Sequence, residues 1–201
     1  MNLDGLIVGL GNPGKEYENT RHNLGFMLAD ALLDEVRRIA PHAVTSLGTG
    51  KKKYDLWKCA PLTGGSSWLV AKPLTFMNRS GDAVAHICGF YRIPPEKILV
   101  LHDELDLPLG RMKFKTAGGL AGHNGLKSIA ERTGSKDFHR LRLGIGKPQS
   151  GQTTGYVLGR FGKDEQALVE KVLQAGVEGI RIFAQQGAVA ATQFINAQDI
   201  Q

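Results

Sequence analysis

A short apolar run that breaks into a glycine-proline turn constrains this chain more than any other feature. Residues 6–10 are long enough for one buried strand, and Gly11-Asn12-Pro13-Gly14 can neither continue a strand nor begin a regular helix. A polar loop then leads to Arg21-His22-Asn23, and apolar residues at helical spacing follow from residue 24. His22 thus lies on a loop near the end of a buried strand, where ligands bind in α/β proteins. We interpret His22 as the candidate catalytic residue.

Beyond this start, strand-like and helix-like patterns alternate, which predicts an α/β fold built on one sheet. No repeat, linker or shift in composition interrupts the 201 residues, so we expect a single domain over residues 1–201. Residues 148–162 have no periodicity and are interpreted as a mobile loop or lid. The remaining expected elements are strands at 68–71, 97–101, 111–115 and 139–145, two short strands within 44–60, a turn at 64–66, and helices at 24–39, around 83–91, after 125, at 163–186 and at 188–195.

Positive charge is concentrated in one part of the chain. The net charge is +6, and residues 111–147 hold nine lysines and arginines against two acidic residues. A local basic patch favours contact with phosphate over a generally basic surface, although a solvated face is an equally good explanation of a charge cluster alone. Lys113 and Lys115 would share one face of their strand, as would Arg140 and Arg142.

The sequence also points to a cytoplasmic protein. No stretch is apolar and long enough to cross a membrane, and the first residues do not resemble a signal peptide. The two cysteines, Cys59 and Cys88, lack the spacing of a metal site and are expected to be reduced.

Polar side chains follow several of the predicted strands. Asn12, Asn78 and Asp103 come after strands, and Asn124 lies on a glycine-rich loop before a helix. If the sheet is mostly parallel, these strand ends meet at one edge, and the four side chains could share a pocket with His22. Each asparagine alone is better explained by turn formation, because asparagine tolerates left-handed backbone. The inference therefore depends on their joint placement.

The chemistry that suits such a pocket is hydrolysis. The chain has no Gly-x-Ser-x-Gly elbow, no cysteine in a reactive setting and no His-Glu-x-x-His zinc motif. What remains is a neutral imidazole at His22 that takes a proton from water, with the Asp103 carboxylate holding the ring in the useful tautomer. Neutral amides can bind peptide groups and stabilise an oxyanion.

Two other motif matches point to different chemistry, and both are weak. Residues 9–14 fit the Gly-x-Gly-x-x-Gly pattern of dinucleotide-binding proteins, but about eight polar residues separate this loop from the following helix. The acidic turn His102-Asp103-Glu104-Leu105-Asp106 could bind a metal, but it has no second ligand cluster. A dinucleotide oxidoreductase is therefore a distant alternative.

Six blocks of sequence, taken in order, resemble bacterial peptidyl-tRNA hydrolases. They span the chain from about residue 6 to the final helix, and their joint occurrence is far more specific than any single block. The blocks are Gly9–Gly14 with Tyr17, Thr20-Arg21-His22-Asn23-x-Gly25, Lys72-Pro73-x-Thr75-Phe76-Met77-Asn78-x-Ser80-Gly81, His102–Pro108, Gly122-His123-Asn124-Gly125-Leu126-Lys127 and Phe138-His139-Arg140-Leu141-Arg142-x-Gly144-Ile145-Gly146.

The resemblance implies an enzyme that hydrolyses the ester between a peptide and the 3′ end of tRNA. It implies a monomer with a central mixed, mostly parallel, twisted sheet flanked by helices, and no metal or organic cofactor. By position in the motifs, His22 would be the base and Asp103 its support. Substrate-binding residues would be Asn12, Tyr17, Met77, Asn78 and Asn124. Phosphate-binding residues would be Lys113, Lys115, His123, Arg140 and Arg142.

One loop departs from the family pattern. Many members read Gly-Gly-His-Gly-Gly-His before the asparagine, whereas this chain has Gly118-Gly119-Leu120-Ala121-Gly122-His123. His123 and Asn124 are retained, so the difference concerns the flexibility of the loop and its contact with tRNA. The alternative from another functional class is a non-catalytic RNA-binding relative, which the intact set of polar residues disfavours.

Overall fold

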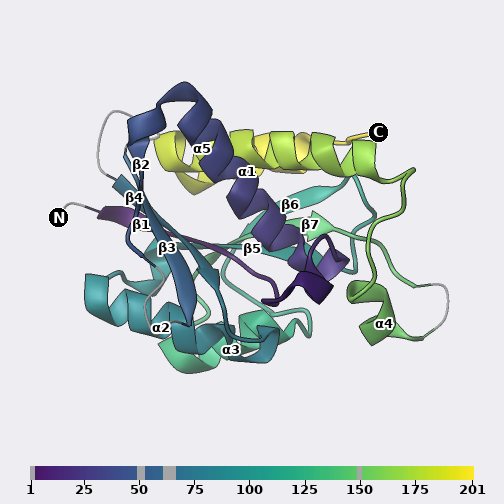
Figure 1. Ribbon diagram of the computed structural model, residues 1–201, viewed down its shortest axis with the longest axis horizontal. Coiled ribbons are helices and arrows are strands. Elements are labelled where there is room, and N and C mark those ends of the chain that lie inside the picture. The colour runs from purple at the N-terminus through teal and green to yellow at the C-terminus, as the bar shows by residue number, and fades with distance from the viewer. Residues whose placement is uncertain (1–2, 49–52, 61–66, 149–150) are drawn as a thin grey trace.

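A computed structural model describes residues 3–48, 53–60, 67–148 and 151–201, and over these residues it forms a seven-stranded sheet in the order β2-β3-β4-β1-β5-β7-β6 (Figure 1). The turn expected at residues 64–66 lies outside the described residues. The strands are β1 (Leu3–Gly9), β2 (Val44–Ser46), β3 (Tyr54–Cys59), β4 (Ser67–Pro73), β5 (Ile98–Glu104), β6 (Met112–Thr116) and β7 (His139–Gly144).

The single mixed sheet expected from the sequence is confirmed, but the expectation that it is mostly parallel is wrong, because only the pairings between the four middle strands are parallel. Strands β4, β1, β5 and β7 pair in parallel, while β2 and β3 on one side and β6 on the other pair antiparallel. The apolar content of the strands explains why the parallel strands lie in the middle of the sheet and the antiparallel strands at its sides. All seven residues of β5 are buried, as befits a strand covered on both faces, whereas β6 alternates buried and exposed residues at the edge.

Helices cover both faces of the sheet (Figure 1). Helices α1 and α5 lie on one face and α2 and α3 on the other, and each pair buries one of the two apolar clusters formed by alternate strand residues. The helices are α1 (Leu24–Ile39), α2 (Ser80–Tyr91), α3 (Asn124–Thr133), α4 (Thr153–Val157) and α5 (Gln166–Ala197), with single 3-10 turns at η1 (Lys15–Tyr17), η2 (Arg21–Asn23), η3 (Pro41–Ala43), η4 (Met77–Arg79) and η5 (Pro95–Lys97).

Helix α5 folds back on itself. Gly187 has φ 84° and ψ −176°, a conformation that a side chain would strain, and it separates the two helical segments that the sequence pattern predicts. A Cβ atom on Gly179 would come within 2.1 Å of Ile195, so the second segment packs directly on the first. The returning segment then reaches the edge of the sheet, where Asn196 accepts a hydrogen bond from the main-chain N–H of Phe114 in β6 at 2.8 Å.

Two sequence-based expectations change in the structure. Residues 148–162 were expected to form a loop without regular structure, but they contain the short helix α4. A helix of five residues is too short to show a periodic pattern in sequence. Asp103 was expected to follow its strand, but β5 continues through Glu104, so Asp103 lies within it. Among the described residues, no helix is both long and apolar enough to span a bilayer.

Candidate active site

His22 reaches the sheet because helix α1 approaches it very closely. The helix begins just after η2, and a Cβ atom on Gly25 would lie 2.3 Å from the carbonyl oxygen of Leu101 and 2.6 Å from the main-chain nitrogen of Leu10. Only glycine allows this contact between the first turn of α1 and the ends of β1 and β5. The preceding turn, η2, thereby brings His22 beside Asp103.

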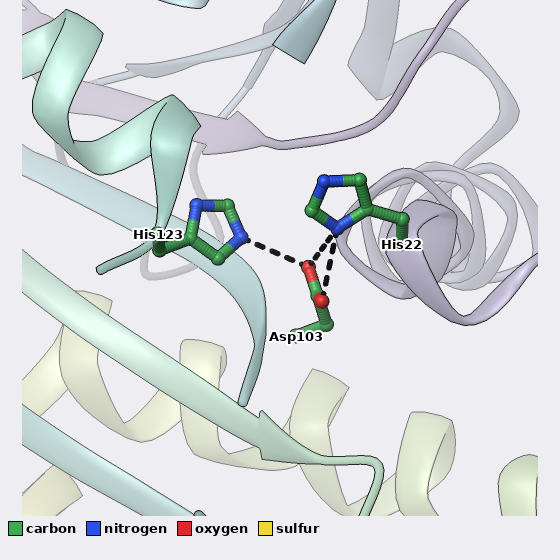
Figure 2. A group of neighbouring side chains, drawn as sticks. All are labelled: His22, Asp103 and His123. Atoms are coloured by element: carbon green, nitrogen blue, oxygen red, sulfur yellow. Dashed lines mark hydrogen bonds and ion pairs between the residues drawn. The ribbon is translucent and has the colours of Figure 1, made fainter. Parts of the chain in front are cut away.

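Two histidines share the carboxylate of Asp103 (Figure 2). His22 Nδ1 lies 3.0 Å from both carboxylate oxygens, and His123 Nε2 lies 2.9 Å from Oδ1. The Asp103 side chain is 3% exposed and that of His22 is 14% exposed. The three residues come from η2, β5 and the residue just before α3, so the fold itself assembles this cluster.

The hydrogen bonds define which nitrogens carry protons. Nδ1 of His123 accepts from the main-chain N–H groups of Gly125 (3.2 Å) and Leu126 (3.4 Å) at the start of α3, so its Nε2 carries the proton and donates to Asp103. His22 donates to the same carboxylate through Nδ1. The remaining nitrogen of His22, Nε2, then has a free lone pair and can accept a proton.

The Asp103 carboxyl group is held in its charged form. Burial opposes ionisation, but electrostatic attraction to the His123 ring and the hydrogen bonds from His123 and His22 outweigh it, so the pKa of Asp103 lies well below its usual range. A carboxylate that stays ionised can fix the His22 tautomer and stabilise the imidazolium that forms when Nε2 takes a proton.

Asn12 is fixed by two partners that leave part of its side chain available. Its main-chain N–H donates to Asn23 Oδ1 at 2.8 Å, and its carbonyl accepts from Asn23 Nδ2 at 3.0 Å. The side-chain oxygen of Asn12 accepts from the Met77 N–H at 2.8 Å, which ties the end of β1 to η4. The Nδ2 group of Asn12 is left to donate into the pocket.

A single pocket of about 330 Å³ joins the candidate residues from the different strands. It contains both His22 and Asp103 together with the three candidate asparagines. Tyr17 lies further out, with its ring edge-on to Phe76 at 6.4 Å between centroids. The lining residues are Asn12, His22, Phe76, Met77, Asn78, Asp103, Glu104, Leu105, Ala121, Gly122, His123, Asn124, Thr153, Thr154, Val157 and Leu158.

The predicted cations gather on β6 and β7. In the antiparallel register Lys113 lies opposite Arg142, and Lys115 lies opposite Arg140. Arg142 donates from Nε to Glu104 at 2.9 Å, whereas Lys113 and Lys115 are exposed and have no ion-pair partner among the described residues. A second hollow of about 240 Å³, which Lys115, Arg140 and Arg142 help to line, shares Glu104 and Ala121 with the first pocket.

Two residues expected to bind phosphate have hydrogen-bond partners within the protein. Both ring nitrogens of His123 are bonded within the protein, to Asp103 and to the first turn of α3, so His123 belongs to the histidine–aspartate cluster. The Arg140 side chain is buried, and its terminal nitrogens donate to the carbonyls of Ala117 and Gly119. Arg140 thus supports the glycine-rich loop. Neither arrangement is visible in sequence, because each depends on side-chain direction.

A further histidine, His102, lies beneath the cluster and was missed in the sequence. Its ring centroid is 4.9 Å from that of His123, the residue is fully buried, and its Nδ1 donates to the carbonyl of Asp103 at 2.8 Å. Burial, helped by the electrostatic effect of the neighbouring His123 ring, lowers the pKa of His102 to about 3. His102 is therefore neutral at physiological pH.

The burial of neutral His102 should make the protein acid-sensitive. Unfolded chains take up a proton at His102 below a pH of about 6.5, whereas the folded protein does not until about 3, so acid favours unfolding. Between pH 6 and 5, the free energy of unfolding should fall with a slope that approaches about 1.4 kcal/mol per pH unit. Denaturant titrations of wild type and His102→Asn measure this slope, which the substitution should reduce. The exposed His42→Asn should keep it, and equal slopes in all three proteins would contradict the assignment.

Other residues missed by sequence reasoning act as supports. Asn23 clamps Asn12, and Thr153 and Thr154 of α4 complete the pocket wall. Only Asn23 had a sequence signal, its place next to His22 in the same motif. His22, Asp103 and His123 also offer three metal-ligand atoms within 4.8 Å of one another. Here the two ring nitrogens carry protons directed at Asp103, and metal binding would have to displace both.

Fold and site together define an α/β protein in which a histidine, held by a buried carboxylate, faces a pocket rich in amides. The family model for peptidyl-tRNA hydrolase matches residues 6–201. A peptidyl-tRNA hydrolase of Nitratidesulfovibrio vulgaris (strain DP4) is 61% identical over 198 residues, which is 98% of each chain. One of Neisseria meningitidis serogroup A is 44% identical over 194 residues, 96% of this chain and 97% of the relative.

A solved structure is similar over almost the whole chain. The crystal structure of peptidyl-tRNA hydrolase from Acinetobacter baumannii has a TM-score of 0.88 and 37% sequence identity, and covers 99% of this chain and 98% of its own. The chain therefore belongs to the peptidyl-tRNA hydrolase family, which confirms the resemblance seen in its motifs.

Proposed function

We infer that this protein hydrolyses the ester bond that joins a peptide to tRNA in peptidyl-tRNA. Membership of the family indicates the reaction. One observation supports the assignment of this reaction to the pocket around His22. An imidazole whose Nδ1 is held by an ionised carboxylate faces the same pocket as three side-chain amides. This arrangement suits general-base attack of water on an ester, with the amides available to bind the peptide and the oxyanion.

In the proposed mechanism His22 handles the proton. Nε2 takes a proton from water as the water oxygen attacks the ester carbonyl, and Asp103 stabilises the resulting imidazolium. When the tetrahedral intermediate collapses, the bond to the ribose oxygen breaks and the imidazolium returns the proton to that oxygen. The products are a peptide with a free carboxyl group and tRNA with a free hydroxyl, and His22 is neutral again.

The asparagines would recognise the peptide through its main chain. Asn12, Asn78 and Asn124 each offer a donor and an acceptor, which match peptide groups whatever the side chains are. Asn12 Nδ2 is a donor suited to the oxyanion, because its carboxamide is held rigidly by Met77 and preorganised donors are the effective ones. Met77 and Phe76 line the pocket and would flank the peptide. Tyr17 would contribute to this wall by packing against Phe76.

The β6–β7 cations would hold a phosphate of the tRNA. Lys115→Ala combined with Arg142→Ala should weaken tRNA binding, and the slope of log affinity against log salt should become shallower by about one for each phosphate that is no longer neutralised. Binding titrations at several salt concentrations measure this, with Lys58→Ala on β3 as a control far across the sheet. Equal salt dependence in wild type and the double variant would exclude this cation pair.

Turnover with a defined substrate tests the function directly. Release of tRNA from an N-blocked aminoacyl-tRNA should occur with wild type in the presence of EDTA, since the proposed mechanism uses no metal. Binding of tRNA without turnover would favour the non-catalytic RNA-binding alternative. A monomer acting in the cytoplasm fits the proposal, and sedimentation of the free protein tests the monomer.

A further inference from the structure

Arg21, the residue next to His22, is enclosed by a distant part of the chain. Its two terminal nitrogens donate to the two carboxylate oxygens of Glu165 at 3.0 and 2.7 Å, and its side chain is only 11% exposed. The guanidinium carbon also lies 4.6 Å from the ring centroid of Tyr156 and 4.7 Å from that of Phe161. Arg21 thus meets a carboxylate and two aromatic rings at once.

Main-chain contacts join the same two segments. The N–H of Arg21 donates to the carbonyl of Gly159 at 2.9 Å, and Thr20 and Arg160 form an isolated antiparallel bridge. Tyr156 in turn donates its hydroxyl proton to the carbonyl of Ile145, just beyond β7. Residues 156–165 are therefore anchored to η2, which carries His22, and to the sheet.

The anchored segment begins within the short helix α4, which forms one wall of the pocket. Thr153, Thr154 and Val157 of α4, with Leu158 after it, line the same pocket as His22 and the asparagines. Because α4 has only five residues, its position depends on what holds its ends. The contacts of Arg21 begin within α4 at Tyr156 and continue along the chain to Glu165.

We propose that Arg21 is a positioning residue for the hydrolysis, which fixes the α4 wall relative to His22. The inference rests on the proposed function, because it concerns the placement of the peptide ester between His22 Nε2 and this wall. An arginine suits the role, since its planar guanidinium can stack on aromatic rings and donate two parallel hydrogen bonds to one carboxylate. Lysine offers a point charge without either property.

Kinetics of conservative variants test the proposal. Arg21→Lys keeps the charge and should lower kcat/KM by about tenfold or more, because small displacements of reacting groups cost rate steeply. Glu165→Gln should show a smaller loss in the same direction. Deacylated tRNA should bind all variants within about twofold of wild type, since the cationic surface lies on β6–β7. Arg37→Ala, which removes an exposed ion pair with Asp34, is the matched control and should not change kcat/KM.

Chemical rescue separates positioning from folding. Methylguanidinium added to Arg21→Ala should restore part of kcat/KM, and methylammonium should not. Wild-type kcat/KM in Arg21→Lys, or losses fully accounted for by the unfolded fraction seen in circular dichroism, would overturn the inference. If Arg21→Ala does not fold, the kcat/KM values of Arg21→Lys and Glu165→Gln still test the proposal. Wild type without turnover would overturn the proposed function and this inference together, whereas an active wild type with an unimpaired Arg21→Lys overturns only the inference.

Discussion

Replacement of His22 by alanine should lower kcat by a factor of about 10² to 10⁴, while tRNA affinity stays nearly unchanged. The variant loses the ring nitrogen that can accept a proton in the pocket, because both nitrogens of His123 are bonded within the protein and His102 is fully buried. The cations proposed to bind phosphate lie on β6 and β7, away from η2, so the ground-state contacts with tRNA should persist.

The measurement is single-turnover release of tRNA from an N-blocked aminoacyl-tRNA, with deacylated tRNA binding measured in parallel. His42→Ala, which alters an exposed histidine in η3, is the matched control and should behave as wild type. Parallel loss of turnover and of tRNA binding would instead make His22 a binding or structural residue. Another residue would then have to act as the general base for the hydrolysis.

The Asp103→Asn variant should also lose about 10² to 10⁴ in kcat, comparable to the effect of the same change in a serine-protease triad. Asp103 accepts hydrogen bonds from two histidines at once. An asparagine has one acceptor and one donor group, so at least one ring must turn or change tautomer, and His22 Nε2 no longer presents a fixed lone pair. Loss of the negative charge also removes the partner of the imidazolium.

A double variant makes this prediction sharper. If Asp103 acts through His22, the combination His22→Ala with Asp103→Asn should be about as slow as His22→Ala alone, because groups that act as a unit are not additive. Asp106→Asn, an exposed acid two residues beyond β5 that pairs with Lys147, is the control and should retain activity. Multiplicative losses in the double variant would show that Asp103 has a separate role.

The sequence predicted elements well where a local pattern decides them. Helix α1 was expected at 24–39 and has those bounds, because its apolar residues repeat every three to four positions and Pro41 follows. The gathering of Asn12 and Asn78 around His22 was foreseen from strand ends, and that of Asn124 from its place on a glycine-rich loop before a helix. That reasoning needs only topology, since parallel neighbours end at one edge.

What the sequence could not provide depends on contacts between distant residues. Arg140 and Arg142 occupy equivalent places in one alternating strand pattern, yet one is buried under a loop and the other is partly exposed beside Glu104. Arg21 and Glu165 are 144 residues apart, so no local pattern could indicate their pairing. His123 was assigned by its neighbours in sequence, whereas its ring direction, set by the first turn of α3, decides its partner.

The reversal of chain direction at Gly187 within α5 affects the order in which the sheet is completed during translation. The open side of β6 is covered by residues near 196–200, through Asn196 to Phe114 and through the Ile200 N–H to the Gly110 carbonyl. During translation these residues emerge from the ribosome long after the strand they protect. The nascent sheet therefore carries an unpaired edge until residues 196–200 have been synthesised, and such edges recruit other strands. Slow translation of residues 117–200 should accordingly favour aggregation of this protein more than slow translation of the residues before β6.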